Sequence, residues 1–278
     1  MGYIVGIDVG GSTTKIVAFD SNKKMIEPMF VTAQDQMTSI YGAFGKFIST
    51  NNIVLDDVDT VMITGVGSTF VGGNLYGIPC RHISEFQCVG IGGQYLSGLE
   101  RALVVSMGTG TAAVFANGNE LTYIGGTGVG GGTIIGLAKK MLGIGDIHNL
   151  YELATSGNLN NIDLLIGDIT NKSISPTLTD GVTAANFGNL SDLATPEDIA
   201  LGILNLVFET IGMVAVFASR SCNINDVVLT GTLTRAPQAK PIYDKMKSMF
   251  GVNFIIPEYS RYGTVIGAAL SYFKENNE

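Results

Sequence analysis

A glycine turn between two apolar segments near the start of the chain most limits how it can fold. The segments Ile4–Val9 and Ile16–Phe19 have strand length and are rich in β-branched residues, which predicts a hairpin of two buried strands. Asp8 lies near the end of the first strand, where a lone buried carboxylate would be costly. The turn beside it offers backbone N–H groups, hydroxyls and one ammonium group, which suits Mg²⁺ and a polyphosphate. A tight turn whose aspartate only bonds its neighbours is the alternative.

The same pattern occurs a second time, in the segment Val104–Thr111 and the apolar residues that follow it. Aligned without gaps, Asp8 corresponds to Ser106 and Thr13 to Thr111, each pair 98 residues apart. Such a duplication predicts an α/β protein of two similar halves, each with a phosphate-holding hairpin. Two hairpins that face each other across a cleft can hold one polyphosphate from both sides. In this respect the chain resembles the actin, sugar kinase and Hsp70 superfamily, which implies two ribonuclease H-like halves with a nucleotide cleft between them.

Composition narrows the class of protein. With 46% apolar and 14% charged residues among 278, the chain has ample material for a core. A net charge of -8 argues against partners with an anionic surface, so neither nucleic acid nor a membrane is expected. The three cysteines have no C-x-x-C spacing, and the apolar run Ile199–Ser219 contains Asn205 and Glu209, which is typical of a buried helix. We therefore expect a cytoplasmic protein.

We place the boundary between the halves near Arg101. Residues 1–100 would hold the first hairpin, and residues 101–278 would hold the second hairpin, a glycine-rich loop and long helices. The loop contains G-x-G-x-x-G from Gly126 to Gly131, but a hairpin rather than a βαβ unit precedes it, which disfavours a dinucleotide fold. Because the glycines directly before the helix have no bulky side chains, a phosphate group can still approach the helix N-terminus.

Glu85 is the candidate general base. It follows a predicted strand and directly precedes a predicted helix from Gln87 to Leu99. Phosphoryl transfer from ATP needs a carboxylate that orients or deprotonates the attacking hydroxyl. Alternatively, Glu85 has only a structural role, because the helix dipole favours an acidic residue at a helix N-terminus.

Eight short segments taken together make the chain resemble a type II (Fumble-like) pantothenate kinase over nearly its whole length. They are Gly6–Lys15, Ser84–Phe86, Met107–Thr111, Gly125–Gly136, Leu164–Ile169, Thr183–Gly188, Thr230–Thr232 and Tyr262–Leu270. The resemblance implies transfer of the ATP γ-phosphate to the primary hydroxyl of pantothenate, the first step of coenzyme A synthesis. It also implies a homodimer in which the Thr183–Gly188 loop reaches the substrate site of the partner.

The resemblance also implies a role for individual residues. Glu85 would be the catalytic base and Asp8 would bind the metal. The nucleotide would be held by Gly10, Gly11, Ser12, Thr13, Thr14, Lys15, Thr109, Gly131, Gly132, Thr133, Ile134, Ile135, Ile147 and Thr232. The acceptor would be held by Ser106, Tyr123, Gly125, Thr183 and Ala184.

Tyr123 departs from the family pattern, because members usually carry an arginine at this position, two residues before the glycine run. Tyrosine offers a hydroxyl but no charge. Pantetheine or another small alcohol is therefore the alternative acceptor. An ATPase activator of the 2-hydroxyacyl-CoA dehydratase type is a second alternative, which would place Cys80 or Cys88 at an iron–sulfur cluster.

Overall fold

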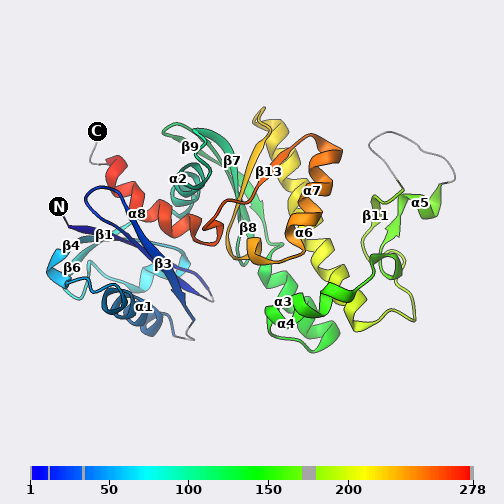
Figure 1. Ribbon diagram of the computed structural model, residues 1–278, viewed down its shortest axis with the longest axis horizontal. Helices are drawn as coiled ribbons and strands as arrows, with labels where there is room; N and C mark the ends of the chain where they lie inside the picture. The colour runs from blue at the N-terminus through cyan, green and yellow to red at the C-terminus, as the bar shows by residue number, and fades with distance from the viewer. Residues whose placement is uncertain (1, 12, 33–34, 171–179, 276–278) are drawn as a thin grey trace.

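The computed structural model describes residues 2–11, 13–32, 35–170 and 180–275. Two separate sheets lie side by side along the longest axis of the molecule (Figure 1). The first sheet contains β1 (Tyr3–Val9), β2 (Thr14–Phe19), β3 (Met25–Val31), β4 (Val58–Thr64), β5 (Asn74–Leu75) and β6 (Ile78–His82). The second contains β7 (Arg101–Met107), β8 (Thr111–Asn117), β9 (Glu120–Thr127), β12 (Asp226–Thr230) and β13 (Asn253–Ile255).

The two sheets have the same topology. The first has the order β3-β2-β1-β4-β6, and the second has the order β9-β8-β7-β12-β13 when it is followed in the corresponding direction. In each, three antiparallel strands are followed by two strands that run parallel to the first strand of the hairpin. The duplication predicted from the two hairpins is therefore a duplication of whole sheets.

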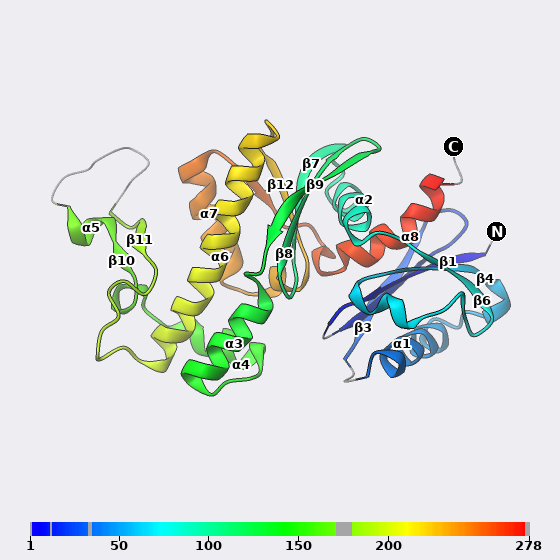
Figure 2. The same ribbon diagram turned by 180° about the vertical axis from the view of Figure 1, so that it is seen from behind.

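The helices cover both faces of the two sheets. They are α1 (Gln36–Thr50), α2 (Glu85–Ser97), α3 (Gly131–Leu142), α4 (Ile147–Leu153), α5 (Ile166–Ile169), α6 (Pro196–Ser221), α7 (Ala239–Phe250) and α8 (Gly263–Glu275). Short 3₁₀ helices include η1 (Leu55–Asp57), η2 (Val66–Phe70), η3 (Ala154–Ser156), η4 (Leu159–Asn161), η5 (Thr232–Arg235) and η6 (Ser260–Tyr262). A small ribbon of β10 (Leu164–Leu165) and β11 (Thr183–Ala185) lies at the far end of the second half (Figures 1 and 2).

Helix α6 begins as its sequence indicates, with Thr195 as N-cap and a reciprocal bond from the Thr195 N–H to Asp198. Its length and composition would allow it to cross a membrane, but 61% of its most apolar window is buried. The buried residues of α6 pack against the second sheet, including Phe208 and Val216. As expected from its polar residues, α6 is mostly a core helix.

Two helices do not follow the division of the sequence into two ranges. Helix α8, the last element of the chain, packs on the first sheet through residues such as Val265 and Ala269. Helix α2, which precedes residue 101, packs on the second sheet through Val89. The two helices lie against each other between the sheets (Figure 2). The division at residue 101 thus separates the sheets, whereas α2 and α8 connect them.

Glycines bring the backbones of α2 and α8 into contact. A Cβ added at Gly92 would lie 1.8 Å from the carbonyl oxygen of Gly263, and one added at Gly267 would lie 1.8 Å from that of Cys88. On the other side of α8, a Cβ at Gly6 of β1 would lie 2.5 Å from the carbonyl oxygen of Val265. Strand β1 and helices α8 and α2 are therefore held together by backbone contacts at these three glycines.

We expect Gly92→Ala and Gly267→Ala to lower the free energy of unfolding by about 2 kcal/mol or more, because the added methyl group must push two backbones apart. The matched control is Gly42→Ala in the exposed face of α1, where nothing lies within 4 Å. There alanine should stabilise by about 0.5–1 kcal/mol. Urea unfolding of the three variants measures both effects, and equal stabilities would contradict the proposed contact.

Candidate active site

Asp8 and Lys15 form the charged centre of the first hairpin. Ile4, Gly6 and Asp8 share one face of β1, and the first two lie under α8. Asp8 continues this face toward the hairpin turn, and its charge acts on Glu85 of α2, the helix that packs on the second sheet. Asp8 thus lies on the side of the first sheet that faces the second sheet, a region that we call the gap. Lys15 is its cross-strand partner, and its Nζ lies 3.4 Å from Oδ2 of Asp8, with both side chains about one-tenth exposed. The buried carboxylate therefore has a partial counterion.

The turn of the first hairpin is closed by its own backbone. Gly10 donates its N–H to the carbonyl of Thr13 over 3.0 Å. Thr14 faces the other side of the sheet, where its hydroxyl accepts a bond of 2.7 Å from Ser39 of α1. Gly11 has open space around it, and Ser12 lies outside the described residues.

The second hairpin has a shorter turn than the first. Val9 pairs with Thr14 across four turn residues, whereas Met107 pairs with Thr111 across three. Thr111 therefore corresponds in structure to Thr14 and not, as the gap-free alignment predicts, to Thr13. The alignment holds for Asp8 and Ser106, which precede the turn. The two turns differ in length by one residue, and the strands on either side correspond in the two hairpins. The sequence pattern of the strands therefore did not show the difference in turn length.

The glycine run lets α3 dock directly on the second hairpin. Gly131 and Gly132 donate their N–H groups to the carbonyls of Gly108 and Thr109, each over 2.9 Å. A Cβ at Gly130 would lie 2.6 Å from the carbonyl oxygen of Thr109. The glycines thus permit close backbone approach, and the first N–H groups of α3 are already used by the hairpin.

Thr232 joins the same cluster from the neighbouring strand. It follows Gly231, whose φ is +93° and whose added Cβ would lie 2.5 Å from the carbonyl oxygen of Met107. Thr109, the start of α3 and Thr232 are therefore neighbours in the structure. Thr133 caps α3, Ile134 is buried in the core, Ile135 is exposed, and Ile147 starts the adjoining α4.

Glu85 is the first residue of α2, two residues earlier than the predicted helix start. Glu85 is exposed to solvent, although neighbouring protein partly desolvates its carboxyl group. Partial burial raises the pKa of the Glu85 carboxyl, the negative charge of Asp8 raises it further, and Lys15 opposes both. Asp8, Lys15 and Glu85 therefore act on one another electrostatically, although they come from three different elements.

Tyr123 contacts Phe86, the residue that follows Glu85 in the sequence. Its ring stacks on that of Phe86 with centroids 4.0 Å apart and planes 21° apart. A bulge at Ile124 follows, where Ala113 pairs with Gly125 and Val114 with Tyr123. Gly125 has φ +146°, which only glycine adopts readily. Phe86, which follows Glu85 directly, is a neighbour of Tyr123 that the sequence analysis did not single out.

Thr183 and Ala184 lie far from this cluster. They belong to β11, at the opposite end of the molecule from the first sheet (Figures 1 and 2). Thr183 donates a hydrogen bond of 2.9 Å to Glu209 of α6. Within one chain the structure does not bring these two residues to the predicted acceptor site.

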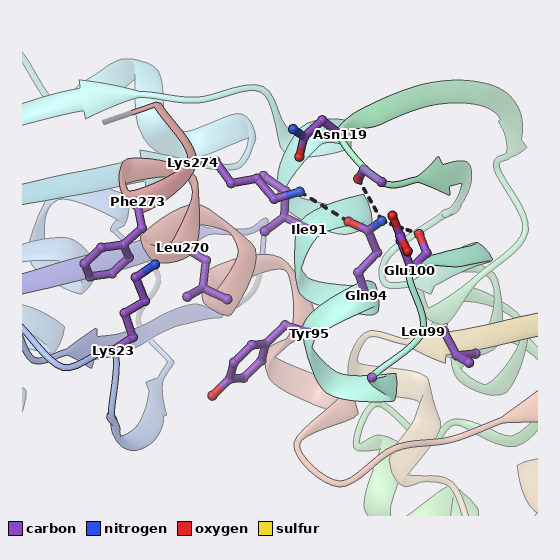
Figure 3. Close-up of a pocket in the computed structure, with 12 residues that line it drawn as sticks. Lys23, Ile91, Gln94, Tyr95, Leu99, Glu100, Asn119, Leu270, Phe273 and Lys274 are labelled. Carbon is purple, nitrogen blue, oxygen red and sulfur yellow. Dashed lines mark hydrogen bonds between the residues drawn. The ribbon is translucent and has the colours of Figure 1, made fainter. Parts of the chain in front are cut away.

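A cavity of about 520 Å³ lies on the other side of the α2–α8 crossing (Figure 3). Its lining includes Lys23 from the β2–β3 turn and Asn119 from the β8–β9 turn, at the strand ends opposite to the two glycine turns. Lys274 of α8 donates to Gln94 of α2 over 3.4 Å at its edge. Because these residues are remote from Asp8 and Glu85, we do not assign the reaction to this cavity.

The same architecture is known in solved structures. An activator of 2-hydroxyisocaproyl-CoA dehydratase from Clostridium difficile with bound ADPNP superposes with a TM-score of 0.70 over 99% of this chain and 96% of that one, at 19% identity. A ROK family glucokinase from Streptomyces griseus in complex with glucose and AMPPNP gives 0.60 over 96% and 98%, at 14% identity. The fold is the actin-like ATPase fold with two mixed sheets, as expected.

Sequence comparison narrows this class. The Fumble family model matches residues 101–246. A type II pantothenate kinase from Oceanobacillus iheyensis is 30% identical over 96% of this chain and 98% of its own length, and one from Staphylococcus saprophyticus is 26% identical over 95% and 97%. The chain belongs to the Fumble family.

The electrostatic coupling at the site can be measured directly. Lys15→Met should raise the pKa of Glu85, because a neighbouring positive charge is lost, and Asp8→Asn should lower it, because a negative charge is lost. Lys46→Met, on the exposed side of α1, is the control and should leave the pKa unchanged. Carbon-13 NMR titration of labelled glutamate measures the three variants. Shifts of the same sign for Lys15→Met and Asp8→Asn would refute the coupling.

Proposed function

We propose that this protein transfers the γ-phosphate of ATP to the primary hydroxyl of pantothenate. The observation that carries the proposal is the meeting of Asp8, Lys15 and Glu85 at the gap between two equivalent hairpins. Family membership supports it, because the relatives compared above are type II pantothenate kinases. The elevated pKa of Glu85 suits a base that must accept a proton from a hydroxyl.

Each residue then has a distinct task. Lys15 and the backbone of the Gly10–Thr13 turn would bind the β- and γ-phosphates, while Thr109 and Thr232 would contact the rest of the nucleotide. Glu85 would orient the acceptor hydroxyl and take its proton as the oxygen attacks phosphorus. The Phe86–Tyr123 stack would border the acceptor, together with Ser106 and Gly125.

A magnesium ion fits the first hairpin. Mg²⁺ binds through one or two carboxylates and completes its shell with water and substrate phosphates. Asp8 offers a carboxylate whose counterion lies at 3.4 Å, longer than a close N⁺–H···O⁻ bond. Bound there, Mg²⁺ would neutralise charge on the phosphate oxygens, while Asp8 holds its place at the end of β1.

We also propose a homodimer. Strand β11, which contains Thr183 and Ala184, lies at the opposite end of the molecule from the first sheet (Figure 1), so these residues cannot serve the acceptor site of their own chain. Leu190 and Leu193, which follow β11, are 50% and 88% exposed, so this end of the molecule offers apolar surface to a second copy. Light scattering that gives only the mass of one chain at micromolar concentration would exclude this part of the proposal.

The dehydratase-activator alternative has little support from the cysteines. Cys88 is fully buried under α8, and burial raises the pKa of its thiol to about 12. Cys80 is half-buried on β6, and burial raises the pKa of its thiol to about 11. Thiolates are the ligands of iron–sulfur clusters, so two thiols of high pKa, one of them inaccessible, are poorly suited to bind one between subunits.

Assays of ATP turnover with pantothenate test the central proposal. Glu85→Gln keeps the shape of the side chain and removes the base, so kcat should fall by about 10²–10⁴-fold while the affinity for ADP changes little. Glu120→Gln, an exposed change at the far end of β9, is the control and should behave like the wild type. Near-wild-type turnover by Glu85→Gln would remove Glu85 from the mechanism.

Tyr123 should govern the choice of acceptor. A neutral residue in place of a cationic partner forfeits about 1.5–3 kcal/mol, or about one to two decades of affinity for a carboxylate. We therefore expect weak pantothenate binding or a preference for neutral pantetheine. Tyr123→Arg should lower the pantothenate KM with little change in kcat, whereas Tyr123→Phe, which keeps the stack on Phe86, should not. Saturation of the wild type at low micromolar pantothenate, unchanged in Tyr123→Arg, would overturn this assignment.

A further inference from the structure

Arg261 lies on an aromatic ring between the two sheets. It belongs to η6, the 3₁₀ helix directly before α8, and its guanidinium carbon lies 3.4 Å from the centroid of the Phe30 ring on β3. Figure 1 shows the segment before α8 passing between the first sheet and the second. A guanidinium stacked flat on a ring keeps its edge N–H groups free for another partner.

The charge of Arg261 is not balanced within the described part of the chain. No described carboxylate lies within ion-pair distance of it, and its buried Nε has no hydrogen-bond partner there. Burial lowers the pKa of this guanidinium; Tyr262 opposes the shift, and the positive charge of Arg235 adds to it. A half-buried cation beside a second cation is costly unless an anion completes the site.

The register of the first sheet places Arg261 at the end of the charged row. Phe30 pairs with Lys15, and Lys15 pairs with Asp8. Cross-strand partners share a face of the sheet, so Phe30, Lys15 and Asp8 form one row facing the gap. Arg261 lies over the Phe30 end of this row and extends it with a second positive group.

Ser260, the residue before Arg261, connects η6 to η5 and to the glycine that precedes it. The carbonyl of Ser260 accepts the N–H of Gly231 over 2.9 Å, and the hydroxyls of Ser260 and Thr234 lie 2.8 Å apart. Arg235, the last residue of η5, is exposed beside them. Arg261 thus lies between the first sheet, which carries the β1–β2 hairpin, and η5 of the second half.

We propose that Arg261 binds the phosphate groups of the nucleotide and that Arg235 adds a second positive charge at the same place. The planar fork of arginine suits bidentate contact with phosphate oxygens, and Phe30 fixes the plane of that fork. The inference rests on the proposed function, because it assumes that a nucleotide lies between the hairpins. A role confined to packing between η6 and β3 is the alternative.

Calorimetric titration with ADP and with adenosine, both in the presence of MgCl₂, separates phosphate binding from packing. Arg261→Met should weaken ADP binding by about 10- to 100-fold and leave adenosine binding unchanged. Arg235→Met, an exposed change that should not disturb folding, should weaken ADP binding by about two- to five-fold. Arg261→Lys keeps the charge without the fork and should give an intermediate loss.

The matched control is Arg101→Met. Arg101 also stacks on a phenylalanine, with its guanidinium carbon 5.3 Å from the centroid of Phe115, but it lies at the start of β7, away from the hairpin turns. Its variant should bind ADP as the wild type does.

Unchanged ADP affinity in Arg261→Met and Arg261→Lys would overturn the inference while leaving the proposed function intact. A parallel loss for ADP and adenosine, with a lowered melting temperature, would assign Arg261 to packing and also overturn it. Failure of the wild type to bind ADP would instead reject the proposed function together with the inference.

Discussion

The position of the candidate base depends on backbone contact between two helices. Gly6, Gly92 and Gly267 let β1, α8 and α2 approach until their main chains touch. Because no flexible side chain lies between them, the start of α2 is fixed relative to the end of β1, and so is Glu85 relative to Asp8. Close packing of this kind transmits small shifts rather than absorbing them. The same two helices join the halves, so the packing that fixes these carboxyl groups also connects the two sheets.

The charges in the gap are balanced only in part. Asp8 and Glu85 repel each other, Lys15 attracts both, and Arg261 lacks an acid partner among the described residues. Two unfavourable terms follow from this arrangement, the repulsion between the two acids and the partial burial of a cation. Phosphate groups with a bound cation would relieve both at once, because they place a positive ion near the acids and oxygens near the cation. This arrangement favours an anionic, metal-bound ligand over a neutral one.

The sequence predicted the parts of the structure that depend on local pattern. Apolar segments of strand length on either side of a glycine turn indicated both hairpins, and the apolar run Ile199–Ser219 with its polar Asn205 and Glu209 indicated the buried helix α6. The sequence did not show that α2 packs on the second sheet and α8 on the first. The spacing of glycines indicates that two backbones come close, but it does not identify the two segments involved. The stack of Tyr123 on Phe86 joins residues that are remote in sequence, so no spacing could predict it. One signal was available and not used: Thr64–Gly65 and Thr230–Gly231 each end the strand parallel to the hairpin, with both glycines at φ near +90°.

The duplicated hairpins are equal in fold and unequal in chemistry. Asp8 and Lys15 face each other in the first, whereas Ser106 and Ala112 take the corresponding places in the second. The first half thus keeps a buried ion pair that a ligand can reorganise, and the second offers backbone, a small hydroxyl and glycine. A symmetrical pair of acids would repel a polyphosphate from both sides. Without an acid at this place, the second hairpin could lie close to a polyphosphate, while in the proposed function Asp8 would hold the metal and Lys15 would supply the cation. We infer that this asymmetry, rather than the fold itself, adapts the duplicated sheets to phosphoryl transfer.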